Sequence, residues 1–125
     1  VENTLCIKDW FEVFVAQDVV LDTLIYDLFY NQFDKHVTAE GGGDLAILIE
    51  FMQEWQKDNV RWVDATLKTT VSESEHNRQL ISTWVKEWKE KAMTDLAPLA
   101  EIAVNAEAMA ASVSVLDSRL AKAGL

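Results

Sequence analysis

The stretch that decides the fold is residues 10–34, WFEVFVAQDVVLDTLIYDLFYNQFD. Apolar residues fall on almost every side of the helix that this stretch predicts, whereas a helix with one wet side would show a continuous polar stripe. Its valines would also permit a strand, but about 25 residues without a breaker are too many for one. Asp9 and Glu12 have the spacing of a capping box, so we expect a helix from about residue 9 to 33 that other protein encloses on most sides.

A second helix is predicted from about residue 44 to 71. The loop before it runs from Thr38 through three consecutive glycines, which free the backbone to reverse direction. Asp44 suits the start of the helix, where a carboxylate meets the positive end of the helix dipole. Trp55 and Trp62 fall on the apolar stripe, so we expect them in a core or an interface rather than in a ligand site.

Two more helices are predicted at about 72–97 and 98–123. Ser72 and Glu75 have capping-box spacing and place the start of the third helix. Pro98 lacks a backbone donor and either kinks this helix or occupies the first position of the fourth.

The helices together predict an all-α fold, a long-helix bundle whose sequential neighbours are antiparallel because the connections are short. Gly124 is a natural stop for the last helix. We expect residues 1–125 to form a single helical domain. Because the chain begins with Val1 rather than methionine, we expect a processed protein or the C-terminal portion of a longer one.

The charge of the chain excludes several classes of partner. Eleven basic against twenty-one acidic residues give a formal charge of −10, which repels nucleic acid and anionic membrane surfaces. No uncharged run approaches the roughly 20 residues of a membrane span. Cys6 is the lone cysteine, so an internal disulfide is impossible and the cytoplasm is the expected location.

Long acidic helices raise the possibility of a carboxylate-bridged di-iron site, which needs Glu-x-x-His on two helices and a lone Glu on two others. One literal match exists, from Glu73 to His76, but it lies at a polar helix start. His36 has Phe33 three residues before it and fails the pattern. We therefore expect neither a metal ligand nor any other cofactor-binding residue in this chain.

Catalytic residues are not expected either. Cys6 has apolar neighbours and no assignable histidine partner, which is typical of a small hydrophobe rather than a nucleophile. Asp18 and Asp22 share a face of the first helix. Either they pair with basic residues of another subunit, or they make ordinary local hydrogen bonds or face solvent.

A chain with more apolar helix surface than it can bury alone is typical of a protein with a subunit interface. The first helix supplies the candidate interface. Its predicted interface residues are Trp10, Phe11, Phe14, Val15, Gln17, Asp18, Leu21, Asp22, Ile25 and Phe29.

Three stretches carry a resemblance to a known family. Residues 10–34 resemble the FVAQ-containing core helix in the beta subunits of bacterial multicomponent monooxygenase hydroxylases. Residues 55–71, WQKDNVRWVDATLKTTV, are similar to the family pattern in which a tryptophan, an acidic residue and an Arg-Trp-like pair lead into a long helix. Residues 77–103, NRQLISTWVKEWKEKAMTDLAPLAEIA, are similar to its Asn-Arg, spaced-tryptophan and Leu-Ala-Pro-Leu run. The LAPLAE stretch and the RLAKAGL ending look closest to phenol hydroxylases; toluene, alkene or methane hydroxylases stay open.

The resemblance implies a ferritin-like helical fold without iron ligands, as the C-terminal portion of a longer, non-catalytic beta subunit. It implies as partners a catalytic alpha subunit, a small gamma subunit, a second beta subunit, a regulatory effector protein and a reductase. The di-iron centre belongs to the alpha subunit, where dioxygen is activated, and the reductase carries FAD and an iron–sulfur cluster that deliver electrons from NADH.

Two other interpretations stay open. One is a small stand-alone ferritin-like enzyme with its own iron. The other is an unrelated helical docking module.

Overall fold

The computed structural model describes residues 2–39 and 43–125, and in these ranges it contains helices and no strand, which confirms the all-α prediction. The helical segments in chain order are η1 (Glu2–Cys6), α1 (Trp10–Phe14), η2 (Val15–Leu21), α2 (Asp22–Tyr26), η3 (Asp27–Phe33), α3 (Asp34–Ala39), α4 (Gly43–Glu73), α5 (Glu75–Ala103) and α6 (Ala106–Ala123). The segment η1 is a 3₁₀-helix, and η2 and η3 are π-helical.

Segments α1 to α3 follow one another without a break and form one helix, residues 10–39, which we call the central helix. Asp9 caps it as predicted, because its carboxylate accepts the backbone N–H of Phe11 at 2.8 Å. Glu12 does not complete a capping box but accepts the indole N–H of Trp88 at 3.1 Å. The helix continues past residue 33 to Ala39, so the predicted loop at its end is wrong for residues 38 and 39; residues 40–42 lie outside the described ranges.

The central helix contains two π-helical segments, η2 and η3, that its sequence pattern does not predict. In a π-helix the backbone bonds join residues five apart, so side chains five apart lie next to each other. Two side-chain hydrogen bonds have this spacing, from Gln17 to Asp22 at 2.9 Å and from Gln32 to Asp27 at 3.0 Å. Both begin or end within a π-helical segment, and both help to hold polar groups along an otherwise apolar helix.

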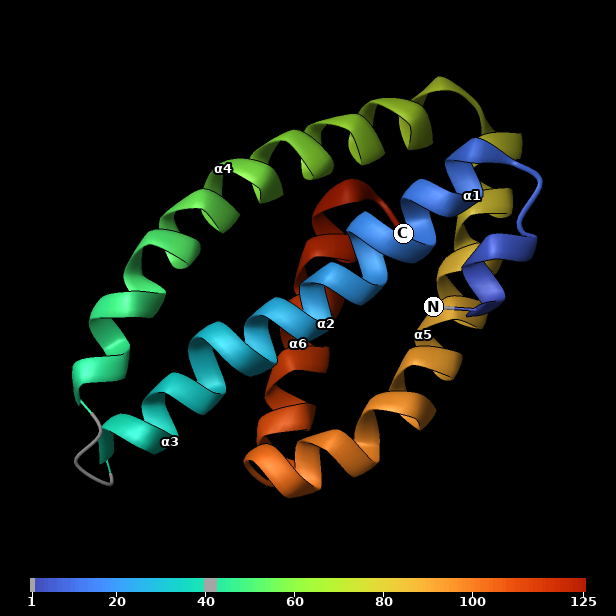
Figure 1. Ribbon diagram of the computed structural model, residues 1–125. Helices are drawn as coiled ribbons and strands as arrows, with labels where there is room; N and C mark the ends of the chain where they lie inside the picture. The colour runs from blue at the N-terminus through green and yellow to red at the C-terminus, as the bar shows by residue number, and fades with distance from the viewer. Residues whose placement is uncertain (1, 40–42) are drawn as a thin grey trace.

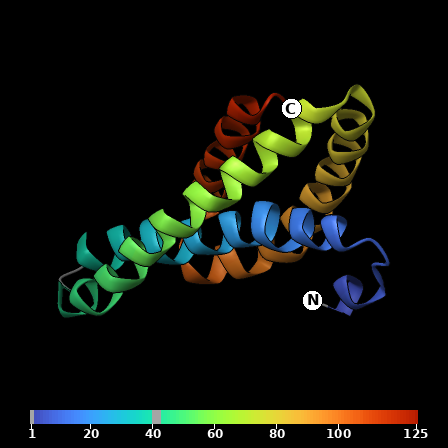
Figure 2. The same cartoon turned by 90° about the horizontal axis from the view of Figure 1, so that it is seen from above.

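The other helices surround the central helix. The helix α4 crosses over it, α5 packs against η2, and α6 packs against α2 and η3 (Figures 1 and 2). The core therefore forms along the central helix, where Val15, Val20, Leu24 and Leu28 are fully buried. Leu67 on α4, Ile81 on α5 and Leu116 on α6 complete it.

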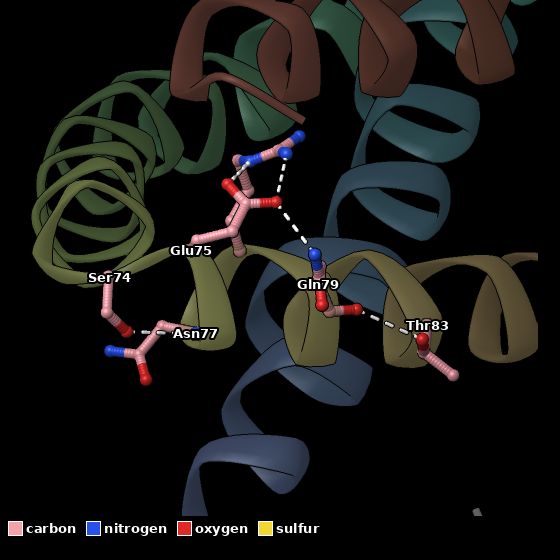
Figure 3. A network of polar contacts seen from close by, with 6 residues as sticks. Ser74, Glu75, Asn77, Gln79 and Thr83 are labelled. Carbon is pink, nitrogen blue, oxygen red and sulfur yellow. Dashed lines mark hydrogen bonds and ion pairs between the residues drawn. The ribbon is translucent and has the colours of Figure 1, made fainter.

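The junction of α4 and α5 lies two residues later than predicted. The cap is Ser74, whose hydroxyl accepts the backbone N–H of Asn77 at 3.1 Å, and α4 extends to Glu73 (Figure 3). Ser72 remains helical and donates its hydroxyl hydrogen to the carbonyl of Thr69 at 2.8 Å. The predicted capping box from residue 72 is therefore wrong, because the extended backbone that a cap requires occurs at Ser74.

The predicted boundary at residues 97 and 98 is also wrong. Pro98 lies inside α5, which continues to Ala103 and bends in its last turns (Figure 1). A proline removes one backbone bond, and the loss of one bond bends a long helix without ending it when packing holds both sides. The break comes at Asn105, whose side chain caps α6 by accepting the backbone N–H of Ala108 at 2.8 Å.

Two terminal predictions hold. Asp44 lies in the first turn of α4, which begins at Gly43. Gly124 ends α6 with a φ of +94°, in the left-handed region that favours glycine.

Candidate functional site

A row of side chains at intervals of four residues runs along the central helix. Its members are Trp10, Phe14, Asp18, Asp22, Tyr26 and Tyr30, and we call it the Trp10–Tyr30 row. An interval of four is slightly more than the roughly 3.6 residues of an α-helical turn and slightly less than a turn of a wider π-helix. In α-helical segments the row therefore rotates slowly around the helix axis in one direction, and in π-helical segments it rotates back. The alternation of the two keeps the row on one side of the helix. Aromatic residues occupy both ends of the row and carboxylates its middle.

Tryptophans of α4 pack edge-on against both aromatic ends of this row. The ring centroids of Phe14 and Trp62 are 5.6 Å apart, and those of Tyr26 and Trp55 are 6.0 Å apart. Trp62 nevertheless remains 57% exposed and Trp55 46% exposed. Neither tryptophan is in the core of this chain, so the core alternative is wrong for both and the interface alternative stays a prediction.

Exposed aromatic side chains are also found at the start of the row and on α4. Trp10 begins the row and is 75% exposed, and Phe51, one turn before Trp55 on α4, is 74% exposed. Soluble monomers rarely leave several large aromatic side chains open on neighbouring elements. This face therefore has the character of a protein contact surface.

The carboxylates of Asp18 and Asp22 lie half-buried in the middle of the row. They line a narrow crevice between the central helix, α4 and α6 together with Gln56, Asn59 and Arg119. Burial raises the pKa of both carboxyls above the ordinary aspartate range. At Asp22 the charge of Asp18 raises the pKa further, while a hydrogen bond from Gln17 opposes the rise.

These raised pKa values predict how the chain responds to pH. The folded state holds the two protons more tightly than the unfolded state, so this contribution to stability is complete below the ordinary aspartate pKa of about 3.9 and is lost as the pH rises through the raised folded values. We expect the Asp18→Asn and Asp22→Asn double variant to unfold with a free energy about 0.5 kcal/mol higher at pH 7, a small gain because solvent screens both half-exposed groups. The gain should vanish near pH 3. Urea unfolding at both pH values measures it, and a loss of stability at pH 7 would contradict it.

The structure places the ten predicted interface residues in three environments. Phe11, Phe14 and Val15 are buried in the core of the chain itself and leave little surface for a partner. Trp10 and Gln17 are exposed. The partly exposed members are Asp18, Leu21, Asp22, Ile25 and Phe29. The central helix is thus enclosed by the chain's own helices on more sides than its sequence suggested.

A buried polar network lies between the central helix and α6, and the sequence pattern did not predict it. Asp27, nearly fully buried, accepts hydrogen bonds from Ser112 at 2.8 Å, from Asn31 at 2.8 Å and from Gln32 at 3.0 Å. The sequence gives little indication of this network, because Ser112 lies in an alanine-rich helix and Asp27, its partner, is 85 residues away in the chain.

Arg119 of α6 joins this region to α4. Its guanidinium is 8% exposed, donates to Asp64 at 2.8 Å and also donates to the hydroxyl of Thr23. The side chain therefore ties α4, α6 and the central helix together. The third guanidinium nitrogen, Nη2, also lies within ion-pair distance of Asp64, at 2.7 Å.

The one Glu-x-x-His match, residues 73–76, forms a helix junction. Glu73 accepts the side-chain amide of Asn77 at 3.2 Å. Glu75 accepts hydrogen bonds from Arg78 and from Gln79, and Figure 3 shows the bond with Gln79. The pairing with Arg78 lowers the pKa of the Glu75 carboxyl. In residues 2–39 and 43–125 no three His, Cys, Asp or Glu side chains gather in a way that could hold a metal ion. The described residues therefore do not fit an iron site.

Within the same residues, no helix combines the length and apolar character that a membrane crossing requires. The thiol of Cys6 is exposed on η1.

Comparison with known proteins agrees with this architecture. A family model described as methane, phenol and alkene hydroxylase matches residues 1–74. The chain is 42% identical over 125 residues to the phenol 2-monooxygenase oxygenase component DmpL of Pseudomonas sp. (strain CF600), covering 100% of this chain and 38% of DmpL. It is 33% identical over 124 residues to the corresponding component MhpL of Acinetobacter pittii (strain PHEA-2), covering 37% of that protein.

More distant similarity extends to the propane 2-monooxygenase hydroxylase component small subunit of Gordonia sp. (strain TY-5), 28% identical over 98 residues. Among solved structures, xenon-pressurized phenol hydroxylase from Pseudomonas sp. OX1 superposes with a TM-score of 0.94 at 36% identity. The match covers 99% of this chain and 38% of that one, so the chain spans well under half the length of these relatives.

Proposed function

Because the chain belongs to the methane, phenol and alkene hydroxylase family, we propose that it is the C-terminal portion of a non-catalytic beta subunit in a phenol-type hydroxylase. In this proposal the chain holds the catalytic alpha subunit in place and contributes no reacting group. The complex, rather than this chain, hydroxylates an aromatic substrate with dioxygen and NADH-derived electrons, and it is cytoplasmic.

The exposed aromatic face carries this proposal. A chain that performed chemistry alone would need an enclosed polar site, whereas the buried Asp27 and Arg119 bind other side chains of the chain's own helices. The surface instead presents exposed tryptophans, a residue type enriched at interface centres, beside half-buried carboxylates. The di-iron centre, which the described residues do not fit, belongs in this proposal to the alpha subunit. The gamma subunit, a second beta subunit, the effector and the FAD- and iron–sulfur-containing reductase are the further proposed partners.

Co-purification with iron analysis tests this function. We expect the full-length subunit, expressed with its neighbouring genes, to elute with a larger chain that carries two Glu-x-x-His motifs. All iron should remain with the larger chain after the two are separated in mild denaturant.

Two outcomes would reject the proposal in favour of the alternatives. Recovery of this chain alone with two tightly bound irons would indicate a stand-alone enzyme. Recovery with a stable partner that has no iron and no Glu-x-x-His motif would indicate a docking module.

A further inference from the structure

The acids of the central helix are not equivalent. Between Lys8 and Lys35 the sequence contains six acidic residues and no basic one. Four of the six accept hydrogen bonds within the chain: Asp9 caps the helix, Glu12 accepts the indole of Trp88, Asp22 accepts the amide of Gln17, and Asp27 accepts Ser112. The carboxylates of Asp18 and Asp22 differ from the others because they lie next to each other, half-buried, in the middle of the Trp10–Tyr30 row.

No cation of the chain lies within ion-pair distance of this pair among the described residues. Arg119 is near enough to Asp22 to lower its pKa somewhat, but its guanidinium binds Asp64 and Thr23. The hydrogen bond that Asp22 accepts comes from a neutral donor, the amide of Gln17. The two carboxylates are therefore partly desolvated and, among the described residues, have no ion-pair partner, which is unfavourable in an isolated chain.

The aromatic rings on both sides determine which cation fits. Trp62 lies against Phe14 on one side of the pair, and Trp55 lies against Tyr26 on the other. A guanidinium is planar, stacks on aromatic faces and can bond two carboxylate oxygens at once, whereas an ammonium is a compact and strongly hydrated charge. A carboxylate pair between aromatic rings is thus better matched to arginine than to lysine.

A second copy of this chain does not fit the same face. A symmetric contact would bring Asp18 and Asp22 of both copies together, and like charges across an interface are costly. The formal charge of −10 adds to this repulsion.

We propose that the Trp10–Tyr30 row, apart from its buried member Phe14, forms with Trp55 and Trp62 the docking surface for a basic helix of another hydroxylase subunit, which places an arginine on Asp18 and Asp22. This inference rests on the proposed scaffold function and adds the chemistry of the partner. The aromatic rings exclude water around the ion pair, and the arginine neutralises the two desolvated carboxylates.

The test uses the reconstituted hydroxylase with the full-length subunit. The Asp18→Asn and Asp22→Asn double variant should bind its partner at least about tenfold more weakly than the wild type, because it leaves a buried arginine unpaired. Its affinity should also fall less steeply with rising NaCl concentration. Analytical ultracentrifugation at several salt concentrations measures both quantities.

The matched control is the Glu90→Gln and Asp95→Asn double variant, which removes two exposed carboxylates of α5 and should assemble like the wild type. Phenylglyoxal modification identifies the cation. One partner arginine should be protected in the wild-type assembly and become reactive when the Asp18/Asp22 variant is assembled at saturating concentration.

Unchanged affinity and salt dependence in the Asp18/Asp22 variant would overturn the inference, as would a wild-type assembly in which no partner arginine is protected from phenylglyoxal. Loss of binding in the control variant as well would also overturn it, because the effect would then reflect net charge. A wild-type subunit that does not assemble with a larger chain at all would instead reject the proposed function.

Discussion

Replacement of Arg119 by methionine is expected to lower the free energy of unfolding by about 2–3 kcal/mol. The guanidinium is buried and binds Asp64 and Thr23, so its loss leaves a carboxylate and a buried hydroxyl without their donor. Breaking a fully buried pair costs roughly 3–5 kcal/mol, and the lower value here reflects the partial exposure of Asp64. Methionine retains much of the side-chain volume, so packing contributes little to the effect.

Arg61→Met is the matched control for this prediction. Arg61 forms an ion pair with Asp58 at 3.0 Å, with both side chains exposed on α4, and such pairs contribute about 0–1 kcal/mol. Urea unfolding of both variants provides the comparison. Equal effects at the two positions would show that the contact between Arg119 and α4 does not hold the helices together.

The second large effect is expected at the tryptophans of α4. The Trp55→Ala and Trp62→Ala double variant should assemble with its partner subunit at least about 100-fold more weakly, since a buried interface tryptophan typically contributes about 2 kcal/mol or more. Each ring packs against the central helix but is about half exposed, so an assembly has substantial aromatic surface to cover. Titration of the partner in ultracentrifugation measures the loss.

A conservative variant separates binding from folding. Trp55→Phe and Trp62→Phe keep a ring against Tyr26 and Phe14, so this double variant should recover most of the affinity. Thermal melting of both variants should show only a modest difference, because the truncated rings lie at the edge of the core. Wild-type affinity in the alanine variant would contradict the assignment of this face as an interface.

The sequence was informative about helices and less so about their ends. Continuous apolar character in residues 10–34 predicted the central helix, because a long helix with apolar residues on nearly all sides must be covered. Caps were harder to place: Ser72 and Ser74 are both plausible caps, and only the backbone conformation distinguishes them. Pro98 was misleading, because neighbouring packing can hold a helix together across one missing hydrogen bond.

The candidate site was only partly predictable. The residues of the row were visible as an acidic pair in an apolar helix, but the π-helical segments that align them have no distinct sequence pattern. Burial of Phe11, Phe14 and Val15 by the chain's own helices could not be separated from burial by a partner. The network of Asp27, Ser112 and Arg119 depends on contacts across more than 80 residues, which periodicity does not reveal.

The central claim is that this chain scaffolds a larger hydroxylase through its exposed aromatic face. Hydroxyl-radical footprinting of the full-length subunit, alone and in the assembled complex, tests it most directly, because it measures solvent exposure at individual tryptophans. We predict that oxidation of Trp10, Trp55 and Trp62 falls several-fold on assembly, while buried Trp88 reacts slowly in both states. Equal oxidation of the three exposed tryptophans in the free subunit and in the complex would contradict the account.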